Sequence, residues 1–255
     1  MGSHCLDCAK AARPDIATRA KWWNARQPTL MTFVLMGINF LVFLWVAASN
    51  ADSLGGRGGI SSQQCDLGLS RDILKFGVNC GDGQVQPEQW YRLISSGFLH
   101  FGIIHIAFNM FMLYQLGQLL ERPLGRLKFT MLYFAALLGG SLGVLIFDQH
   151  ALSGGASGAV FGLMAAAAVG LQHQGVNVFS TSLGTTLLIN FFITFAIPGI
   201  SIGGHVGGAV AGAACGYVML APKWKKFPKW SGYATPAAVA LVCVIASVVI
   251  ASSSA

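Results

Sequence analysis

The chain has 255 residues, of which 54% are hydrophobic and only 10% are charged, with a formal net charge of +7. Soluble domains carry about 25% charged residues, so a water-exposed globular fold of this length would lack polar surface. The basic residues cluster between apolar runs instead of forming one patch, which argues against a nucleic-acid partner. We therefore expect a membrane protein surrounded by lipid.

Seven apolar runs are long enough, or nearly long enough, to cross a bilayer, which takes about 20 helical residues. They occupy residues 30–48, 103–120, 129–147, 156–171, 183–197, 200–220 and 234–251. Polar residues interrupt the second run, and the fourth and fifth are short. The first run begins too late and is too long for a signal peptide. The sequence thus predicts an all-α polytopic membrane protein with seven transmembrane helices.

Lysine and arginine residues set the expected orientation of these helices. They precede the first run, separate the second run from the third, and separate the sixth from the seventh. The positive-inside rule places such segments in the cytoplasm. We therefore expect a cytoplasmic N-terminal segment (1–27), a basic cytoplasmic loop (221–233), and a seventh helix with a short exoplasmic tail (234–255). The C-terminus is then exoplasmic.

Cysteine pairs occur in two of the predicted extramembrane segments. Cys65 and Cys80 lie in a long exoplasmic loop (50–99), where a disulfide between them is permitted; the alternative is two free thiols. Cys5 and Cys8 form half of a zinc-ribbon-like motif, whereas a closed zinc site needs four ligands. We expect no metal there, with a zinc-binding remnant as the alternative.

His205 stands in a glycine-rich stretch of the sixth run. Gly204 and Gly208 are four residues apart, so they form a bare ridge along one side of the predicted helix. Small residues at this spacing let membrane helices approach closely. A packing motif with an incidental histidine would explain the glycines but not the imidazole, because polar residues at membrane depth are costly and usually functional.

Ser157 stands at the start of the fourth run. Gly155 precedes it and Gly158 follows it, so we expect a loop to become a helix near the serine. The backbone N–H groups of a helix N-terminus favour developing negative charge. The glycine ridges of the fourth and sixth helices would bring Ser157 within reach of His205. Phe161, four residues after Ser157, could stack on an imidazole or simply pack in the core.

His105 and Asn109 are four residues apart and share one face of the second predicted helix. Both side chains can donate hydrogen bonds, to a substrate or to a neighbouring helix. All nine acidic residues fall in loops or at the ends of the runs. A channel or ion-coupled transporter is expected to carry charged residues within several spans. The sequence therefore favours a site built on Ser157 and His205 over either of these two classes of protein.

These residues together resemble the rhomboid family of intramembrane serine proteases. The segment Gly155-Ala156-Ser157-Gly158, the glycine-rich setting of His205, and His105-x-x-x-Asn109 occur in the family's order. Further matching pieces are Trp90-Tyr91-Arg92, Phe98-Leu99-His100 and Glu121-Arg122. The resemblance covers about residues 28–220. It implies a six-helix rhomboid-like core followed by a seventh C-terminal transmembrane helix, in a bacterial plasma membrane.

The resemblance also implies a function. It predicts a serine endopeptidase that cuts peptide bonds in or near the transmembrane segments of single-span membrane proteins, without a cofactor. Ser157 would be the nucleophile and His205 the base of a dyad, while the Ser157 N–H, His105 and Asn109 would bind the oxyanion. The sequence departs from the family pattern at Tyr91, where tryptophan is usual, and at Phe161, where tyrosine is frequent. A non-proteolytic rhomboid-like protein that binds membrane clients is the alternative.

Overall fold

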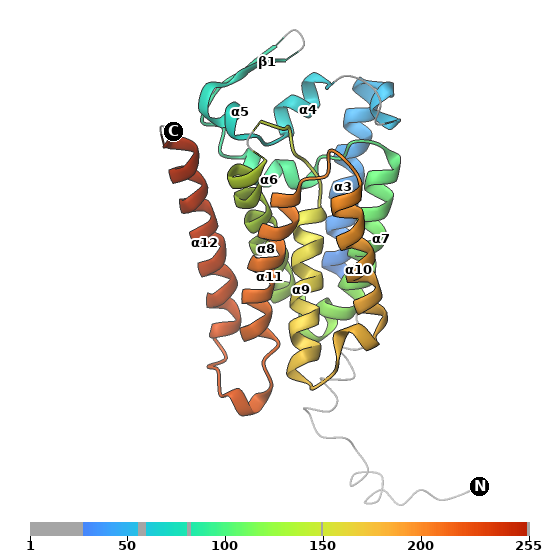
Figure 1. Cartoon of the computed structure of the whole chain (residues 1–255), viewed down its shortest axis with the longest axis vertical. Coiled ribbons are helices and arrows are strands. Elements are labelled where there is room, and N and C mark those ends of the chain that lie inside the picture. The colour runs from blue at the N-terminus through green and yellow to red at the C-terminus, as the bar shows by residue number, and fades with distance from the viewer. Residues whose placement is uncertain (1–27, 56–59, 81–82, 149, 254–255) are drawn as a thin grey trace, which may run out of the picture.

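The computed structural model describes residues 28–55, 60–80, 83–148 and 150–253 (Figure 1). Cys5 and Cys8, with the rest of the N-terminal segment, lie outside the described residues. Within the described ranges, five helices are long and apolar enough to cross a membrane. They are α3 (Leu30–Ser49), α7 (Ile103–Leu124), α8 (Arg126–Phe147), α11 (Ile202–Met219) and α12 (Ser231–Ser252).

Two shorter apolar helices stand among these five, α9 (Ser157–His173) and α10 (Ser182–Ala196). Each of the seven predicted runs therefore coincides with a helix, and the boundaries differ by up to four residues. The all-α polytopic class is confirmed for the bundle. Because α9 and α10 are short, the count of seven membrane crossings stays a prediction.

The α11 helix lies between α8 and α9 and packs against both through glycines. On one side Gly139 and Gly143 of α8 meet Gly207, and on the other Gly158 of α9 meets Gly208. At Gly139, Gly143, Gly207 and Gly208 a side chain would overlap the opposing backbone, and at Gly158 it would be in tight contact with it. The third glycine ridge, on α8, is therefore as important for the packing as the two that the sequence pattern indicated. The last helix, α12, packs on the outer side of α8 and α11 (Figure 1).

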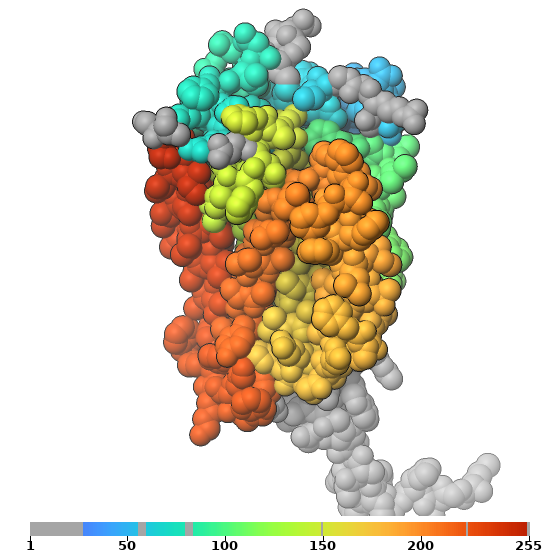
Figure 2. Space-filling view, viewed as in Figure 1, coloured from blue at the N-terminus to red at the C-terminus, as the bar shows by residue number. Residues whose placement is uncertain are grey.

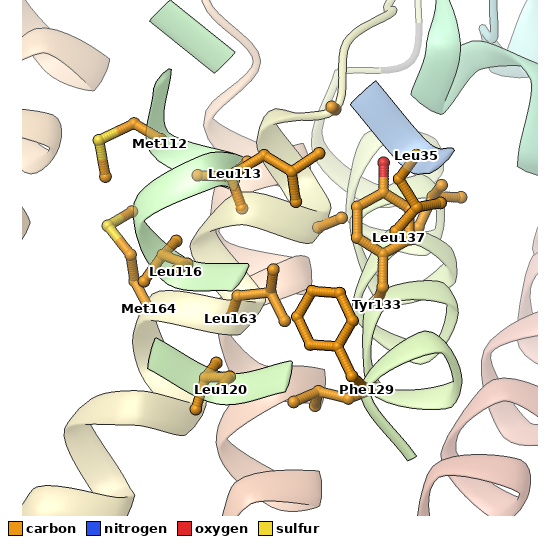
Figure 3. Packing of buried hydrophobic residues seen from close by; sticks show 14 of the residues in the cluster. Leu35, Met112, Leu113, Leu116, Leu120, Phe129, Tyr133, Leu137, Leu163 and Met164 are labelled. Carbon is orange, nitrogen blue, oxygen red and sulfur yellow. The ribbon is translucent and has the colours of Figure 1, made fainter. Parts of the chain in front are cut away.

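The largest hydrophobic cluster joins α3, α7, α8 and α9 (Figure 3). Phe129 and Tyr133 of α8 are fully buried against Leu163 of α9 and Leu113 of α7. In lipid, such side chains stabilise the bundle through van der Waals packing between helices. This cluster makes α7, α8 and α9 a rigid support for the residues at their upper ends.

Glu121 joins the lower end of α7 to the first helix. Its carboxylate is buried and accepts hydrogen bonds from the backbone N–H groups of Met31 (2.9 Å) and Thr32 (2.8 Å) and from the Thr32 hydroxyl (2.6 Å). The first N–H groups of a helix lack partners within the helix, and the helix dipole favours a negative charge there. Glu121 therefore caps α3 from a neighbouring helix.

The first long loop contains more regular structure than the sequence pattern indicated. It holds η1 (Ala51–Leu54), α4 (Ser62–Leu67), α5 (Arg71–Phe76), α6 (Arg92–Ser95) and η2 (Ser96–Phe98). It also contains an antiparallel hairpin of β1 (Val78–Cys80) and β2 (Gly83–Val85). Within the described ranges the bundle is therefore all-α, and one small β-hairpin lies outside it. Two further short turns, η3 (Val178–Ser180) and η4 (Lys223–Lys225), connect helices.

Arg92 anchors this loop to the bundle. Its buried guanidinium donates hydrogen bonds to the carbonyl oxygens of Cys65 and Gly68 and to the Gln89 side chain. Burial lowers the pKa of the Arg92 guanidinium, so these acceptors are needed to stabilise its charged form. Cys65 is buried and disulfide-bonded. The Cys80 side chain lies outside the described part of the structure, so the predicted pairing stays a prediction.

The C-terminal end of α12 lies at the same end of the bundle as this loop (Figure 1). Lys75 of α5 donates to the Ser253 carbonyl oxygen (3.1 Å), and Arg71 donates to the Ser253 hydroxyl (3.4 Å). The loop and the C-terminal end of the bundle therefore share one side, as the distribution of basic residues predicts. Which compartment that side faces stays a prediction.

Candidate active site

Ser157 is the first residue of α9, and its side chain is half-buried. The chain cannot continue a helix backward through Gly155, because this residue has φ = +136°, a conformation that residues with a side chain rarely adopt. The helix therefore begins at the serine, as the glycines predict. The Ser157 N–H belongs to the first turn, where backbone donors have no partner within the helix.

Hydrogen bonds from the first loop fix the backbone before Ser157. Gly155 donates its N–H to the Ser96 carbonyl oxygen (2.8 Å), and Ala156 donates to Nε2 of His100 (3.5 Å). The His100 Nδ1 lies 3.3 Å from the Phe98 carbonyl oxygen and serves as the donor to it, which leaves Nε2 as the acceptor. The sequence pattern placed His100 only in the approach to the second helix, so its contact with Ala156 is a finding of the structure.

His205 lies in the first turns of α11, with 7% of its surface exposed. The Phe161 ring stacks on the imidazole, with centroids 4.0 Å apart and planes inclined by 15°. On the imidazole's edge, Nδ1 lies 2.8 Å from the hydroxyl oxygen of Thr194 in α10. Packing and one hydrogen bond therefore both restrict the orientation of the imidazole.

The first turn of α11 is itself held in place by Asp148, which follows α8. The Asp148 carboxylate accepts hydrogen bonds from the Ser201 hydroxyl (2.6 Å) and the Gly203 N–H (3.0 Å). Ser201 in turn accepts from the Gly204 N–H (2.8 Å). Asp148 thus caps the helix that carries His205, without contacting the imidazole.

Backbone contact between α9 and α11 brings the serine and histidine segments together. A Cβ atom on Gly158 would lie 3.2 Å from the carbonyl oxygen of Gly204, and one on Gly208 would overlap the Gly158 carbonyl. Ser157 and His205 each adjoin this contact along the chain. Among the described atoms no hydrogen bond joins the two side chains, and catalytic pairs in substrate-free sites often tighten only when substrate binds.

His105 packs against Gly155. A Cβ atom on Gly155 would lie 2.9 Å from His105 Nε2 and 3.6 Å from Ser157 Oγ, so the absence of a side chain at Gly155 lets the His105 ring lie this close to the backbone before Ser157. His105 Nδ1 accepts the Phe101 N–H (3.3 Å), which leaves the ring proton on Nε2. This proton is therefore available to an acceptor bound between His105 and Ser157.

Asn109 lies one turn after His105 and is buried. Its side-chain amide donates to the His105 carbonyl oxygen at 3.0 Å. The amide has a second N–H that this hydrogen bond does not use. Of the two predicted oxyanion donors, His105 is the one whose ring packs against Gly155, two residues before Ser157.

A small cavity of about 40 Å³ opens beside Ser157. Its walls include the hydroxyl-bearing residues Ser96, Ser141, Ser153 and Ser201, together with glycines of α8, α9 and α11. One buried water needs roughly 10–15 Å³ of such volume, together with polar partners. The cavity therefore has room for about three or four waters next to the serine.

Thr194 is the residue of this site that sequence reasoning missed. Polar residues recur at Thr186, Asn190 and Thr194 in a mainly apolar helix, a spacing of four that puts them on one face. Only Asn190 and Thr194 of these three are buried. That stripe was the available signal, but it does not reveal which neighbouring helix it faces.

Comparisons with known proteins point to one family. The family model described as Rhomboid domain matches residues 87–222, a range that contains the predicted nucleophile, base and oxyanion residues. The chain is 33% identical over 131 residues to Rhomboid protease GluP of Bacillus subtilis (strain 168), covering 50% of this chain and 25% of that protein. It is 41% identical over 93 residues to Rhomboid-like protease 1 of Toxoplasma gondii, covering 36% and 31% respectively.

A third relative is RHOMBOID-like protein 6, mitochondrial, of Arabidopsis thaliana. It is 40% identical over 101 residues, covering 39% of this chain and 33% of that protein. The chain thus spans between about a quarter and a third of the length of the three relatives. The family-model match covers the helical segment that carries the candidate site.

Proposed function

Because this chain belongs to the rhomboid family and is an integral membrane protein, we propose that it is an intramembrane serine endopeptidase. Its substrates are single-span membrane proteins, cut in or near their transmembrane segments. The observation that carries the proposal is the setting of Ser157 at a helix start, backed by a glycine and facing a histidine-bearing helix across a glycine contact.

Ser157 Oγ attacks the carbonyl carbon of the scissile peptide, and His205 takes the hydroxyl proton. The C–N bond then breaks, and His205 returns the proton to the leaving amine, which leaves an acyl-enzyme. Water hydrolyses this ester through the same histidine, and the serine hydroxyl is regenerated. No carboxylate takes part, so the pair works as a dyad oriented by its neighbours.

The oxyanion formed on the carbonyl is stabilised by donors around Gly155. The Ser157 N–H, His105 Nε2–H and, after a side-chain rotation, the Asn109 amide supply the hydrogen bonds. Support comes from the packing of the His105 ring against Gly155, two residues before Ser157. Removal of one such donor typically lowers kcat by about 10²–10³.

The cavity beside Ser157 supports a preference for small side chains at the residue before the cut. Its volume of about 40 Å³ leaves little room beside a bound water for a branched or aromatic group. A helical substrate segment hides its carbonyl groups in backbone hydrogen bonds, so the segment must unwind before attack. Substrates with helix-destabilising residues near the cut are therefore favoured.

The test is cleavage of a fluorogenic single-span substrate by purified protein in proteoliposomes, together with labelling by a fluorophosphonate. We expect Ser157→Ala and His205→Ala to abolish cleavage, and Ser157→Ala to abolish labelling. Cleavage that persists in either variant contradicts the proposal. A folded wild-type protein that binds the substrate without cutting it favours the client-binding alternative.

Matched controls separate the chemistry from effects on folding. Ser182 is also the first residue of a short helix but is exposed, so Ser182→Ala makes the same change outside the site. His173 lies in the last turn of α9, where its Nε2 is 3.1 Å from the Tyr217 carbonyl oxygen. His173→Ala is the control for His205→Ala. It and Ser182→Ala should both cleave at the wild-type rate, since neither side chain lies near Ser157.

A further inference from the structure

Thr194 contacts the imidazole of His205 from a helix that supplies no other part of the candidate site. Its hydroxyl oxygen lies 2.8 Å from His205 Nδ1 and 2.7 Å from the Asn190 carbonyl oxygen. Both contacts are buried, so neither group can exchange its partner for bulk water. The geometry of this three-atom chain constrains where the protons lie.

A threonine hydroxyl has one proton to donate and lone pairs to accept. The Asn190 carbonyl can only accept, so the Thr194 proton goes to it. The hydroxyl oxygen is then left to accept, and His205 Nδ1 must carry the imidazole proton. In a neutral imidazole the other nitrogen, Nε2, then has a free lone pair, as a base that deprotonates Ser157 requires.

Thr194 belongs to the inner face of α10, while the outer face of this helix is apolar. Phe191, Phe192 and Phe195 are each more than half exposed in the protein, and the space-filling view shows α10 on the outside of the bundle (Figure 2). The buried residues of α10 are few, namely Gly184, Asn190 and Thr194. The hydrogen bond to His205 is therefore one of the few specific attachments of this helix.

We propose that Thr194 is a positioning residue that fixes the tautomer and orientation of His205, so that the catalytic base is competent only while α10 is seated against α11. This inference rests on the proposed protease function and assigns the orienting role, held by a carboxylate in serine–histidine–aspartate triads, to a neutral hydroxyl on a peripheral helix. An outward displacement of α10 would remove the hydroxyl and release the imidazole.

The experiment compares Thr194→Val, which replaces the hydroxyl by a methyl group of similar size, with Thr194→Ser, which keeps it. Two rates are measured: kcat for a fluorogenic single-span substrate in proteoliposomes, and the rate at which a fluorophosphonate labels Ser157. The small label needs the base but no transmembrane substrate, so it separates orientation of the base from substrate entry past α10. We expect Thr194→Val to lower both rates about tenfold, and Thr194→Ser to restore both to within about threefold.

The matched control is Thr186→Val, two turns earlier on α10. The Thr186 hydroxyl donates to the Ser182 carbonyl oxygen (2.9 Å) and does not contact His205. We expect this variant to match the wild type in both rates. If Thr194→Val lowers the melting temperature, Thr194→Ala gives the same comparison against Thr194→Ser.

The inference is wrong if Thr194→Val labels at the wild-type rate, if Thr194→Ser is as slow as Thr194→Val, or if Thr186→Val loses as much as Thr194→Val. A loss of cleavage with unchanged labelling is also against it, because the role would then lie in substrate entry. A wild-type protein that neither cleaves nor labels overturns the proposed function itself, which makes the two failures distinguishable.

Discussion

The contact between α9 and α11 gives a prediction whose size follows from the structure. A Cβ atom added at Gly208 would lie 3.0 Å from Gly158 Cα and would overlap the Gly158 carbonyl. Carbon atoms in favourable contact are about 3.5–4.0 Å apart, whereas this Cβ atom would lie 2.7 Å from the Gly158 carbonyl carbon. Gly208→Ala must therefore separate the two helices by roughly 1 Å. A misplacement of about 1 Å can cost 10²-fold in rate. We expect kcat to fall by about 10- to 100-fold.

The change in stability of this variant is the difference between two opposing effects. Overpacking costs about 1–3 kcal/mol, and replacing a helical glycine by alanine returns up to about 1 kcal/mol. The control is Gly37→Ala in α3, where a Cβ atom would meet nothing within 4 Å. Cleavage and fluorophosphonate labelling are measured for both, with melting temperatures alongside. If folded Gly208→Ala protein cleaves and labels like wild type, close helix contact does not position the pair.

Three further predictions follow from single contacts. Phe161→Ala removes the ring stacked on His205, and since such stacking is worth about 0.5–1.5 kcal/mol, kcat should fall up to about tenfold while Phe161→Tyr stays active. Glu121→Ala leaves the α3 donors unpaired and should lower the unfolding free energy by about 2–3 kcal/mol in a denaturation assay; unchanged stability would contradict the capping role. Asp148→Ala removes the cap of α11 and should lower the unfolding free energy by about 1–2 kcal/mol. It should also reduce fluorophosphonate labelling of Ser157, and full labelling would show that the cap does not affect His205.

The helices themselves were predictable from the sequence because their signal is local. A run of apolar residues must form a helix in lipid, since lipid offers no partners to backbone N–H and C=O groups. All seven runs coincide with helices, including the short α9 and α10. The helix start at Ser157 was also predictable from a local signal, because Gly155 stands two residues earlier and adopts a backbone conformation that favours glycine.

The contents of the first loop were less predictable. The anchoring of Arg92 depends on carbonyl oxygens of Cys65 and Gly68, more than twenty residues earlier in the chain. Carbonyl groups are present at every residue, so no sequence pattern marks which of them will accept. The same holds for the Ser96 carbonyl that accepts the Gly155 N–H.

The sequence by itself determined which residues could carry the chemistry, because a serine and a histidine in glycine-rich apolar runs are costly unless they are used. The distribution of basic residues also predicted that the first loop and the C-terminal end of the last helix lie at the same end of the bundle. The tertiary structure decided what holds the histidine, namely the Phe161 ring and the Thr194 hydroxyl. A stripe of polar residues on α10 predicts a buried face, but only the packing of α10 on α11 pairs that face with His205. Helix periodicity fixes which side chains share a face, whereas the partner of that face depends on the rotation and position of helices distant in sequence.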